Sequence, residues 1–308
     1  MLWRRADIGG PMKRSDTMDI GAVINAIILG ISIGSIFLVA ALGLAIIYGT
    51  AGVINMAHGE FIMLGAYSTY MLQSSLGIPY FLCIPLSFVV VALIGAVIEY
   101  LLIRHLYRRP LDTLLATWGV SLVLMQGVRL IFGSDPKYIQ MPEFLSTNLA
   151  MGPINVSIFR IFVLIVAALF VAGTWALFYR TSFGIKVRAV TQNKEMAASF
   201  GINASRVYSM TFAIGAGLAG AAGALFGVLN IVLPTMGMSY VVEAFLMVVS
   251  GGGSLMGSVI ASGLTGQMQS IFAFIFNDTF ARFLVFILIV VFLRFRPQGL
   301  IGAGATRR

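Results

Sequence analysis

Apolar stretches of membrane-spanning length follow one another along most of the chain, with short polar connections between them. A helical crossing of a bilayer takes about 20 residues, and lipid offers the backbone of each crossing no hydrogen-bond partners but its own. Apolar segments of suitable size lie near residues 20–48, 61–76, 79–103, 112–132, 158–179, 207–233, 238–256, 257–276 and 280–295. The pattern predicts an all-α fold, namely a polytopic transmembrane helical bundle of about 8–9 apolar segments with broken or re-entrant helices.

The composition agrees with this class of protein. Hydrophobic residues make up 59% of the chain and charged residues only 10%, with a mean hydropathy of +0.97, which a soluble domain with a single core does not need. The formal net charge of +9 comes from Lys and Arg near the ends of apolar segments, so we assign it to topology and lipid headgroups rather than to nucleic acid. With Cys83 as the lone cysteine, we expect no internal disulfide, metal site or redox chemistry.

Basic clusters set the expected orientation in the membrane. Lys and Arg in short loops face the cytoplasm, which places residues 104–109, 180–206 and 294–308 inside and the proline-containing loop 134–157 outside. Three apolar segments then separate a basic N-terminus from the cytoplasmic 104–109 cluster. Either the N-terminus lies outside or one segment is re-entrant.

The chain divides into three parts. Residues 1–19 form a basic N-terminal extension, which lies upstream of the true start if that start is Met18. Residues 20–301 form a single membrane domain, and residues 302–308 form a basic C-terminal tail. A start at Met18 would also remove the N-terminal cations that conflict with the orientation.

The only long polar stretch within the membrane domain is residues 180–206, where five cations accompany one acid, Glu195. Its apolar positions from Ile185 to Phe200 predict one short amphipathic helix, ended by Gly201. We expect this cytoplasmic helix to contact a partner protein.

Two interruptions inside the apolar segments are the main functional candidates. Residues 49–60 and 230–243 each combine glycine, an amide and an acid at or near bilayer depth, and a GGGS sequence at 251–254 follows the second. Corresponding broken helices in two halves of a chain point to a transport pathway, and acids within a membrane are functional candidates. The candidate pathway and gate residues are Asn55, His58, Glu60, Asn230 and Glu243.

These residues also have purely structural interpretations, which the sequence leaves open. The glycines would serve close helix packing, and Glu60 and Glu243 would lie paired or solvated at the membrane interface. Asn55 and Asn230 would cap helix breaks. His58 fits a hydrogen-bonded residue at a helix end better than a metal ligand or proton shuttle.

Enzyme-like patterns in the chain are better explained by helix packing. Residues 215–220 match a dinucleotide fingerprint but follow no predicted strand, and residues 30–34 match a nucleophile elbow without its strand and helix. Small residues at these spacings serve helix contacts. The sequence has no P-loop, so the chain is expected to be no enzyme, and any ATP that drives transport is hydrolysed by another subunit.

Several motifs carry a family resemblance. Residues 49–67, with Tyr48 before them, follow the pattern Y-G-x-x-x-x-I-N-x-A-H-G-E-x-x-x-x-G-A-Y, and residues 296–300 read RPQGL. Together with the polar stretch they resemble the permeases of branched-chain amino acid importers of the ATP-binding-cassette type, over residues 20–301. The residues that match the family's cytoplasmic coupling loop, and to which the resemblance gives contact with ATPases, are Gly184, Arg188, Ala189, Asn193, Glu195, Ala197, Ala198 and Gly201.

The resemblance implies partners and a location. It implies a periplasmic solute-binding protein, a second homologous permease, surrounding lipids, and two cytoplasmic ATPases that use ATP and Mg. The chain itself is expected to bind no cofactor. It would lie in a bacterial inner membrane as a multi-pass protein with its C-terminus in the cytoplasm.

The resemblance also gives an expected solute. Within the family, residues 113–127, 190–193, 211–220 and 234–245 look closest to urea-importer permeases, and the sequence shows few charges near bilayer depth that would clamp a zwitterion. Urea is therefore the expected solute, and a branched-chain amino acid or an amide is the alternative. One departure is the sequence at 251–255, which is one residue shorter than the family's G-G-x-G-[SN]-L and concerns the local pore geometry.

Alternatives from other classes are weaker. A secondary transporter or channel would use Glu60 and Glu243 for protons or polar lining, but it would not need a helix that faces an ATPase. An intramembrane hydrolase would need a nucleophile and base pair, which the sequence does not offer convincingly.

Overall fold

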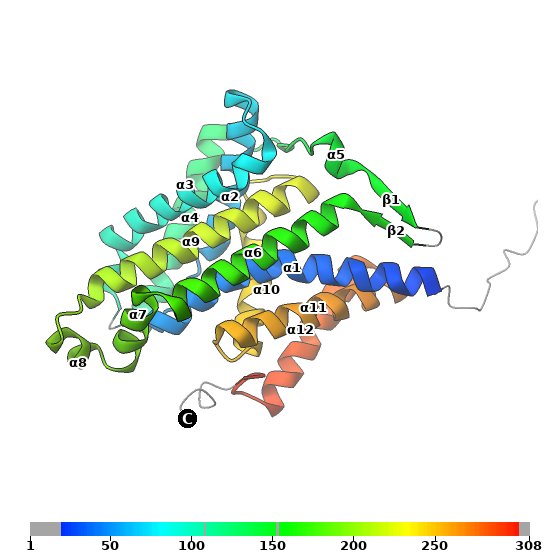
Figure 1. The fold of residues 1–308 in the computed structure, drawn as a ribbon. Coiled ribbons are helices and arrows are strands. Elements are labelled where there is room, and N and C mark those ends of the chain that lie inside the picture. Colours follow the sequence, from blue (N-terminus) through cyan, green and yellow to red (C-terminus); the bar gives the residue numbers. More distant parts are fainter. Residues whose placement is uncertain (1–19, 108, 152–153, 302–308) are drawn as a thin grey trace, which may run out of the picture.

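The computed structural model describes residues 20–107, 109–151 and 154–301 of the 308-residue chain, so the extension 1–19 and the tail 302–308 lie outside the described residues. Helices dominate the described part (Figure 1). In chain order the elements are α1 (Ile20–Ala51), α2 (His58–Leu76), α3 (Tyr80–Leu101), η1 (Ile103–His105), α4 (Pro110–Phe132), α5 (Glu143–Ser146), β1 (Asn148–Met151), β2 (Ile154–Ser157), α6 (Ile158–Arg180), α7 (Ser182–Gln192), α8 (Lys194–Ser199), α9 (Ala204–Leu229), α10 (Met236–Ser250), α11 (Leu255–Ile275) and α12 (Asp278–Phe295).

The predicted helical membrane bundle is confirmed, because each apolar segment of the sequence forms one helix. In the part of the chain that the structure describes, α1, α3, α4, α6, α9 and α11 are long and apolar enough to cross a membrane. The helix at 238–256 was predicted too long, since α10 has only 15 residues and ends at Ser250. Gly252 and Gly253 end it with φ angles of +79° and +69°, which favour glycine and cannot continue a helix.

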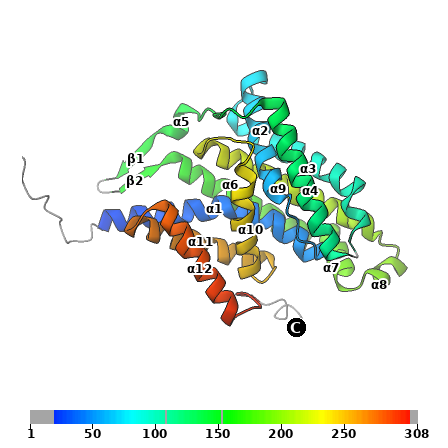
Figure 2. The same cartoon turned by 180° about the vertical axis from the view of Figure 1, so that it is seen from behind.

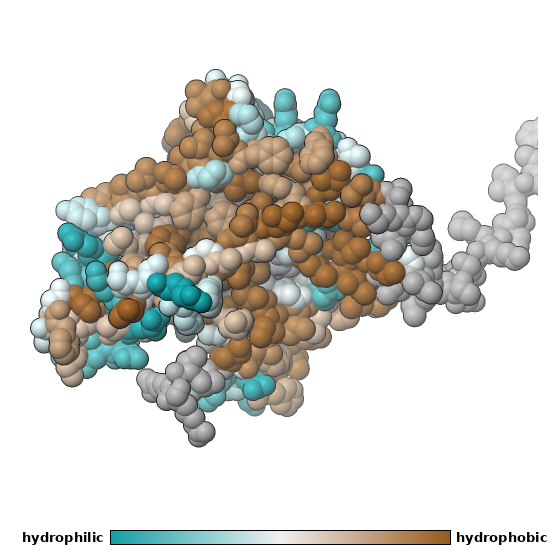
Figure 3. Space-filling model, viewed as in Figure 1, coloured by the Kyte–Doolittle hydropathy of each residue, from teal (hydrophilic) through white to brown (hydrophobic). Residues whose placement is uncertain are grey.

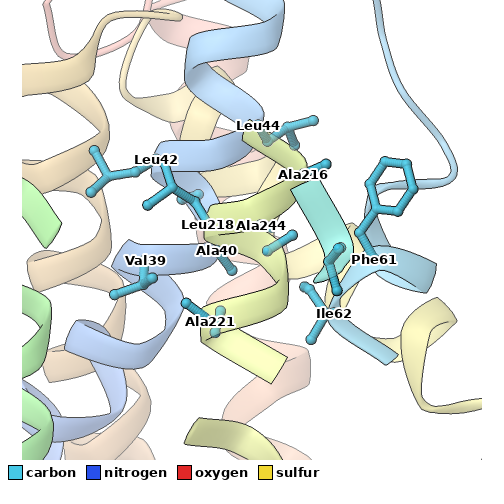
Figure 4. Packing of buried hydrophobic residues seen from close by; sticks show 14 of the residues in the cluster. Val39, Ala40, Leu42, Leu44, Phe61, Ile62, Ala216, Leu218, Ala221 and Ala244 are labelled. Atoms are coloured by element: carbon cyan, nitrogen blue, oxygen red, sulfur yellow. The ribbon is translucent and has the colours of Figure 1, made fainter. Parts of the chain in front are cut away.

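Helices α1 and α9 form the buried centre of the bundle, and small residues let their neighbours approach closely. A Cβ atom at Gly65 of α2 would overlap the carbonyl oxygen of Gly220 in α9, and one at Gly34 of α1 would lie 2.7 Å from the Ser262 oxygen of α11. Figure 4 shows buried apolar side chains of α1, α2, α9 and α10 that pack together in this core. The packing interpretation of the glycine motifs is thus confirmed, as expected for helices that associate without a hydrophobic driving force.

The bundle has two chemically different ends. Helices α7 and α8 lie at one end, and we call it the α8 end; α5, β1 and β2 lie at the opposite end, which we call the hairpin end (Figure 1). Figure 3 shows a mostly hydrophobic face between hydrophilic regions. Helix α1 begins beside β2 and reaches α7 with its later turns, so residue 20 lies at the hairpin end. If loop 134–157 is outside, residue 20 lies outside as well. This arrangement corresponds to the first of the two solutions to the orientation conflict, in which the N-terminus is outside.

The hairpin end contains a small sheet that the all-α prediction missed. Strands β1 and β2 pair antiparallel with Asn148 opposite Ser157. Nearby, the Lys137 amide donates to the Val232 carbonyl at 3.0 Å, and the Val232 amide donates back to Lys137 at 3.0 Å. The loop 134–157 is therefore fastened to the connection between α9 and α10.

Candidate functional site

The α1–α2 connection turns back into the bundle. Gly52, with a φ of +66°, ends the long helix α1, and residues 52–57 lead to His58, which opens α2. His58 contacts the carbonyl of Ala40, near the middle of α1, so α2 begins well inside the bundle. The predicted interruption at 49–60 is therefore a real helix break.

Helix α10 also begins inside the bundle, and it meets the start of α2. A Cβ atom at Gly59 would overlap the carbonyl oxygen of Gly237, so the two backbones touch where both helices begin. Helix α10 also contacts α1, α11 and α12, and Figure 2 shows it running across α1. Because the positive end of each helix dipole lies at its N-terminus, the two starts form a region that favours negative charge.

Three polar side chains from the predicted pathway set are buried at this junction. Asn55, His58 and Glu60 are at most 1% exposed. The Asn55 Oδ1 accepts from the Ala57 amide at 3.1 Å. The His58 Nε2 donates to the Ala40 carbonyl at 2.9 Å, which leaves Nδ1 as the acceptor of a neutral ring. This bond fits the interpretation of His58 as a hydrogen-bonded residue at a helix end.

Each of these side chains has a second polar atom that is buried and unpaired. Within the described residues, Asn55 Nδ2, His58 Nδ1 and Glu60 Oε2 have no hydrogen-bond partner. Buried polar atoms are nearly always paired, and half-satisfied networks are costly. The junction therefore has one donor and two acceptors available for a further polar group.

Helix α4 supplies partners that the sequence analysis missed. Ser121 Oγ donates to Glu60 Oε1 at 3.1 Å, and the Met56 amide donates to Thr117 Oγ1 at 3.1 Å. Thr113, Thr117 and Ser121 are all buried and recur every four residues, which puts them on one helix face. The four-residue spacing of these hydroxyl side chains is visible in the sequence, but the sequence does not show which segment this helix face contacts.

The second interruption separates its two candidates. Asn230 is exposed at the end of α9, where its Nδ2 donates to the Phe226 carbonyl at 3.3 Å. It therefore caps the helix and lies apart from the buried cluster, and its assignment to the pathway stays a prediction. Glu243 lies on α10, six residues beyond the Gly237 contact and hence about 120° away around the helix. The structure does not bring Glu60 and Glu243 together.

Glu243 faces α12 instead. Its Oε1 lies 3.9 Å from Nη1 of Arg282, whose Nη2 lies 3.2 Å from Asp278 Oδ2. Arg282 was not a predicted site residue, because a single cation near a helix start gives no signal of its partner. Folding thus places a cation beside one of the few acids that the sequence put near bilayer depth.

The predicted single helix at 185–200 is two helices, α7 and α8. Asn193 is extended between them, with φ −155° and ψ 105°, and its Oδ1 accepts from the Met196 amide to cap α8. Because Asn is a strong N-cap residue, it starts a new helix at this position. Gly201 ends α8 with a φ of +77°, as predicted.

The polar stretch has a buried and an exposed apolar side. Val187, Val190 and Ala197 are buried, which fixes α7 and α8 to the bundle. Ile185, Met196 and Phe200 are 60%, 58% and 79% exposed. The exposed side chains leave an apolar surface at the α8 end, which we call the α7–α8 surface.

The eight predicted coupling residues divide in the same way. Gly184 and Ala197 are buried and Ala189 is half-buried. At Gly184 a Cβ atom would overlap the Phe178 carbonyl, to which Arg188 Nη1 also donates. The exposed members, which remain available for a partner, are Arg188, Asn193, Glu195, Ala198 and Gly201.

A buried acid at the α8 end was also missed. Glu99 is fully buried; it accepts from Tyr107 at 2.9 Å and from Ser209, and Arg104 donates to Ser205 at 2.7 Å. Burial and the neighbouring Glu99 raise the pKa of Tyr107, which therefore stays protonated as a donor. These bonds fasten the end of α3 to the start of α9, directly after α8.

Two further motifs from the sequence pack on each other. The Leu300 amide, in the RPQGL segment, donates to the Ser250 carbonyl at 2.7 Å. A Cβ atom at Gly252 would overlap the Ile301 carbonyl. The GGGS turn at 251–254 thus holds the C-terminal segment against the end of α10.

Comparisons with known proteins agree with one family. Residues 26–293 match the family model described as branched-chain amino acid transport system, permease component. The chain is 28% identical over 295 residues to the high-affinity branched-chain amino acid transport system permease protein BraD of Pseudomonas aeruginosa, covering 91% of this chain and 95% of that one. It is 28% identical over 289 residues to LivH of Escherichia coli, covering 89% and 93%.

A weaker similarity extends to another permease protein. LivM of Escherichia coli is 24% identical over 292 residues, which cover 86% of this chain and 68% of LivM. No solved structure matches the chain significantly.

Proposed function

The chain belongs to the family of permease components of branched-chain amino acid transport systems, and from this premise we propose that it is the membrane subunit of an ATP-driven importer of branched-chain amino acids. Urea, the solute expected from the sequence, finds no support among the relatives, which are named for branched-chain amino acids. The amino acid alternative is therefore the better-supported solute.

The α7–α8 surface is the observation that carries the importer proposal. It presents exposed Ile185, Met196 and Phe200 at an end of the bundle. Large apolar side chains exposed outside the lipid-facing part of a membrane protein are typical of a docking surface. Since the sequence has no P-loop, the partner at this surface would be the ATPase that the chain lacks.

The charges support a cytoplasmic location for this end. Exposed or half-buried cations at the α8 end outnumber its exposed acids, and Lys and Arg near membrane segments mark the cytoplasmic side. The cations in question include Arg104, Arg109, Lys186, Arg188, Lys194, Arg206 and Arg294. The hairpin end would then receive solute from a binding protein, and the C-terminus would lie inside.

The remaining partners follow from the same proposal. The likeness to both LivH and LivM supports pairing with a second, homologous permease. The junction of α2 and α10 would act as the gate, because its polar atoms and touching helix starts sit deep in the bundle. ATP and Mg would be bound by the ATPases only.

Uptake by the reconstituted system tests the proposal. Proteoliposomes containing the chain, its second permease and the ATPases would receive the binding protein and labelled L-leucine or labelled urea. We expect ATP-dependent leucine uptake that an ATPase-dead variant abolishes, and little urea uptake. Urea uptake without leucine uptake would overturn the solute, and uptake without ATPases would overturn the importer.

A further inference from the structure

A cavity between α10, α11 and α12 contains charges of both signs in an otherwise apolar wall. Its polar lining residues are Ser239, Glu243, Thr265, Gln269 and Arg282. Thr265 and Gln269 are buried, whereas Ser239 is exposed and the Arg282 side chain is 45% exposed, so the cavity has a buried wall on α11 and an accessible side near Arg282. The cavity lies on the face of α10 that turns away from the α2 junction.

The two charges are held near each other without a close bond. Glu243 Oε1 and Arg282 Nη1 are 3.9 Å apart, whereas a direct charged hydrogen bond is about 2.7–2.9 Å long. Among the described residues, Glu243 Oε2 is buried without a hydrogen-bond partner. Arg282 also contacts Asp278, at 3.2 Å, on its exposed side. The acid is therefore under-coordinated, and the cation has donors left over.

The apolar part of the lining is suited to a branched aliphatic group. Leu246 of α10 and Val285, Phe286 and Ile289 of α12 line the same cavity. Ligand sites combine such walls with a few placed polar groups. A ligand that fits would therefore carry a cation, an anion and a small apolar group close together.

From this arrangement we infer that the cavity is a binding site for the zwitterion of an aliphatic α-amino acid within the permease itself. The ammonium group binds Glu243, the carboxylate binds Arg282, and the side chain packs against the wall from α12. Gln269 also lines the cavity and provides a neutral hydrogen-bond donor and acceptor. The inference rests on the proposed import of branched-chain amino acids and gives that import a second selective step after the binding protein.

A neutral solute would not use this site. Urea has no charge to pair with Glu243 or Arg282, so it cannot form the charge-assisted hydrogen bonds on both sides that a zwitterion would form there. The separation of 3.9 Å and the unpaired Oε2 favour a pair that a ligand completes.

Ligand analogues separate the two charge contacts. The permease–ATPase complex in nanodiscs, without binding protein, would be titrated with labelled L-leucine, leucinamide (no carboxylate) and 4-methylpentanoate (no ammonium). Glu243→Gln should weaken leucine and leucinamide binding about tenfold or more and spare 4-methylpentanoate. Arg282→Gln should weaken leucine and 4-methylpentanoate and spare leucinamide.

Control variants keep the result decisive. Glu143→Gln, on exposed α5, should leave all three affinities unchanged, and Glu243→Asp, which retains the charge, should recover part of the binding if Glu243→Gln is unstable. Equal effects on all three ligands, or no effect of either variant, would overturn the site. Leucine uptake by the wild-type system with unaltered affinities in both variants would reject the site while the proposed function stands; absent leucine uptake would reject the function itself.

Discussion

Gly59 and Gly237 bring the first turns of α2 and α10 into backbone contact, and the Glu60 carboxylate lies beside them: a Cβ atom at residue 237 would be 2.7 Å from Glu60 Oε2. Only glycine allows two helices to approach so closely. The contact joins two helix breaks that are about 180 residues apart in the chain. A substitution that displaces one of these helix starts is therefore expected to displace the other.

Neutralising Glu60 should impair transport more than folding. Glu60→Gln keeps an oxygen for Ser121 but removes the charge that two helix starts favour, so we expect leucine uptake to fall about tenfold with normal membrane insertion. Uptake in proteoliposomes and detergent size-exclusion profiles measure the two effects. Wild-type uptake in Glu60→Gln would return Glu60 to a structural role.

Removing Ser121, the hydrogen-bond partner of Glu60, should instead affect stability. Ser121→Ala leaves the buried Glu60 Oε1 without the 3.1 Å bond, at a cost of about 1–3 kcal/mol. Thermal unfolding in detergent measures the loss. Ser74→Ala, at an exposed serine of α2, is the matched control and should leave the unfolding temperature unchanged; equal shifts would contradict the buried bond.

Close packing of α2 on α9 gives a second stability test. Gly65→Ala places a methyl group against the Gly220 carbonyl and should destabilise the fold by about 1–3 kcal/mol. Gly263→Ala is the control, since a Cβ atom there meets no described atom within 4 Å, and it should be neutral or stabilising because Ala favours helix. Unfolding temperatures in the same detergent distinguish the two; a stable Gly65→Ala would contradict the crossing.

Phe200 should anchor the ATPase. It is 79% exposed on the α7–α8 surface, and loss of a central aromatic anchor weakens an interface strongly. Phe200→Asp should reduce co-purification of the ATPases roughly tenfold without lowering membrane levels of the permease. Phe144→Asp, exposed on α5 at the hairpin end, should retain them, and loss of the ATPases in both variants would point to a general defect.

The C-terminal segment should loosen when the turn that holds it changes. Gly252→Ala puts a Cβ atom at a φ of +79° and against the Ile301 carbonyl, so we expect faster amide exchange at residues 298–301. Gly77→Ala has similar strain, at a φ of +63°, but meets no described atom within 4 Å. Hydrogen exchange of both variants checks this, and faster exchange in both would show that strain alone is responsible.

The sequence predicted the helices well because lipid leaves an apolar segment few alternatives. It failed where short-range chemistry decides the backbone. Asn193 capped a new helix inside the expected one, and two glycines after Ser250 ended α10 early. The small sheet at 148–157 depends on contacts within a loop, for which helical periodicity has no signal.

The candidate site was predictable only in part. Asn55, His58 and Glu60 stood out because polar groups are costly in an apolar segment, and the structure groups them. Ser121, which is 61 residues from Glu60 in the chain, and Arg282 became site residues through helix packing alone. Asn230 had the right composition but lies at an exposed helix end.

The contact between α1 and α11 has a consequence for biosynthesis. Gln267 Nε2 donates to the Ile27 carbonyl across 240 residues of chain, and Gly34 lies against Ser262. Helix α1 therefore waits for about 240 further residues to be synthesised before α11 can cover its glycine face. At about 5–20 residues per second that delay lasts on the order of 10–50 s, during which the groove of α1 is open to lipid, the insertion machinery or a membrane chaperone.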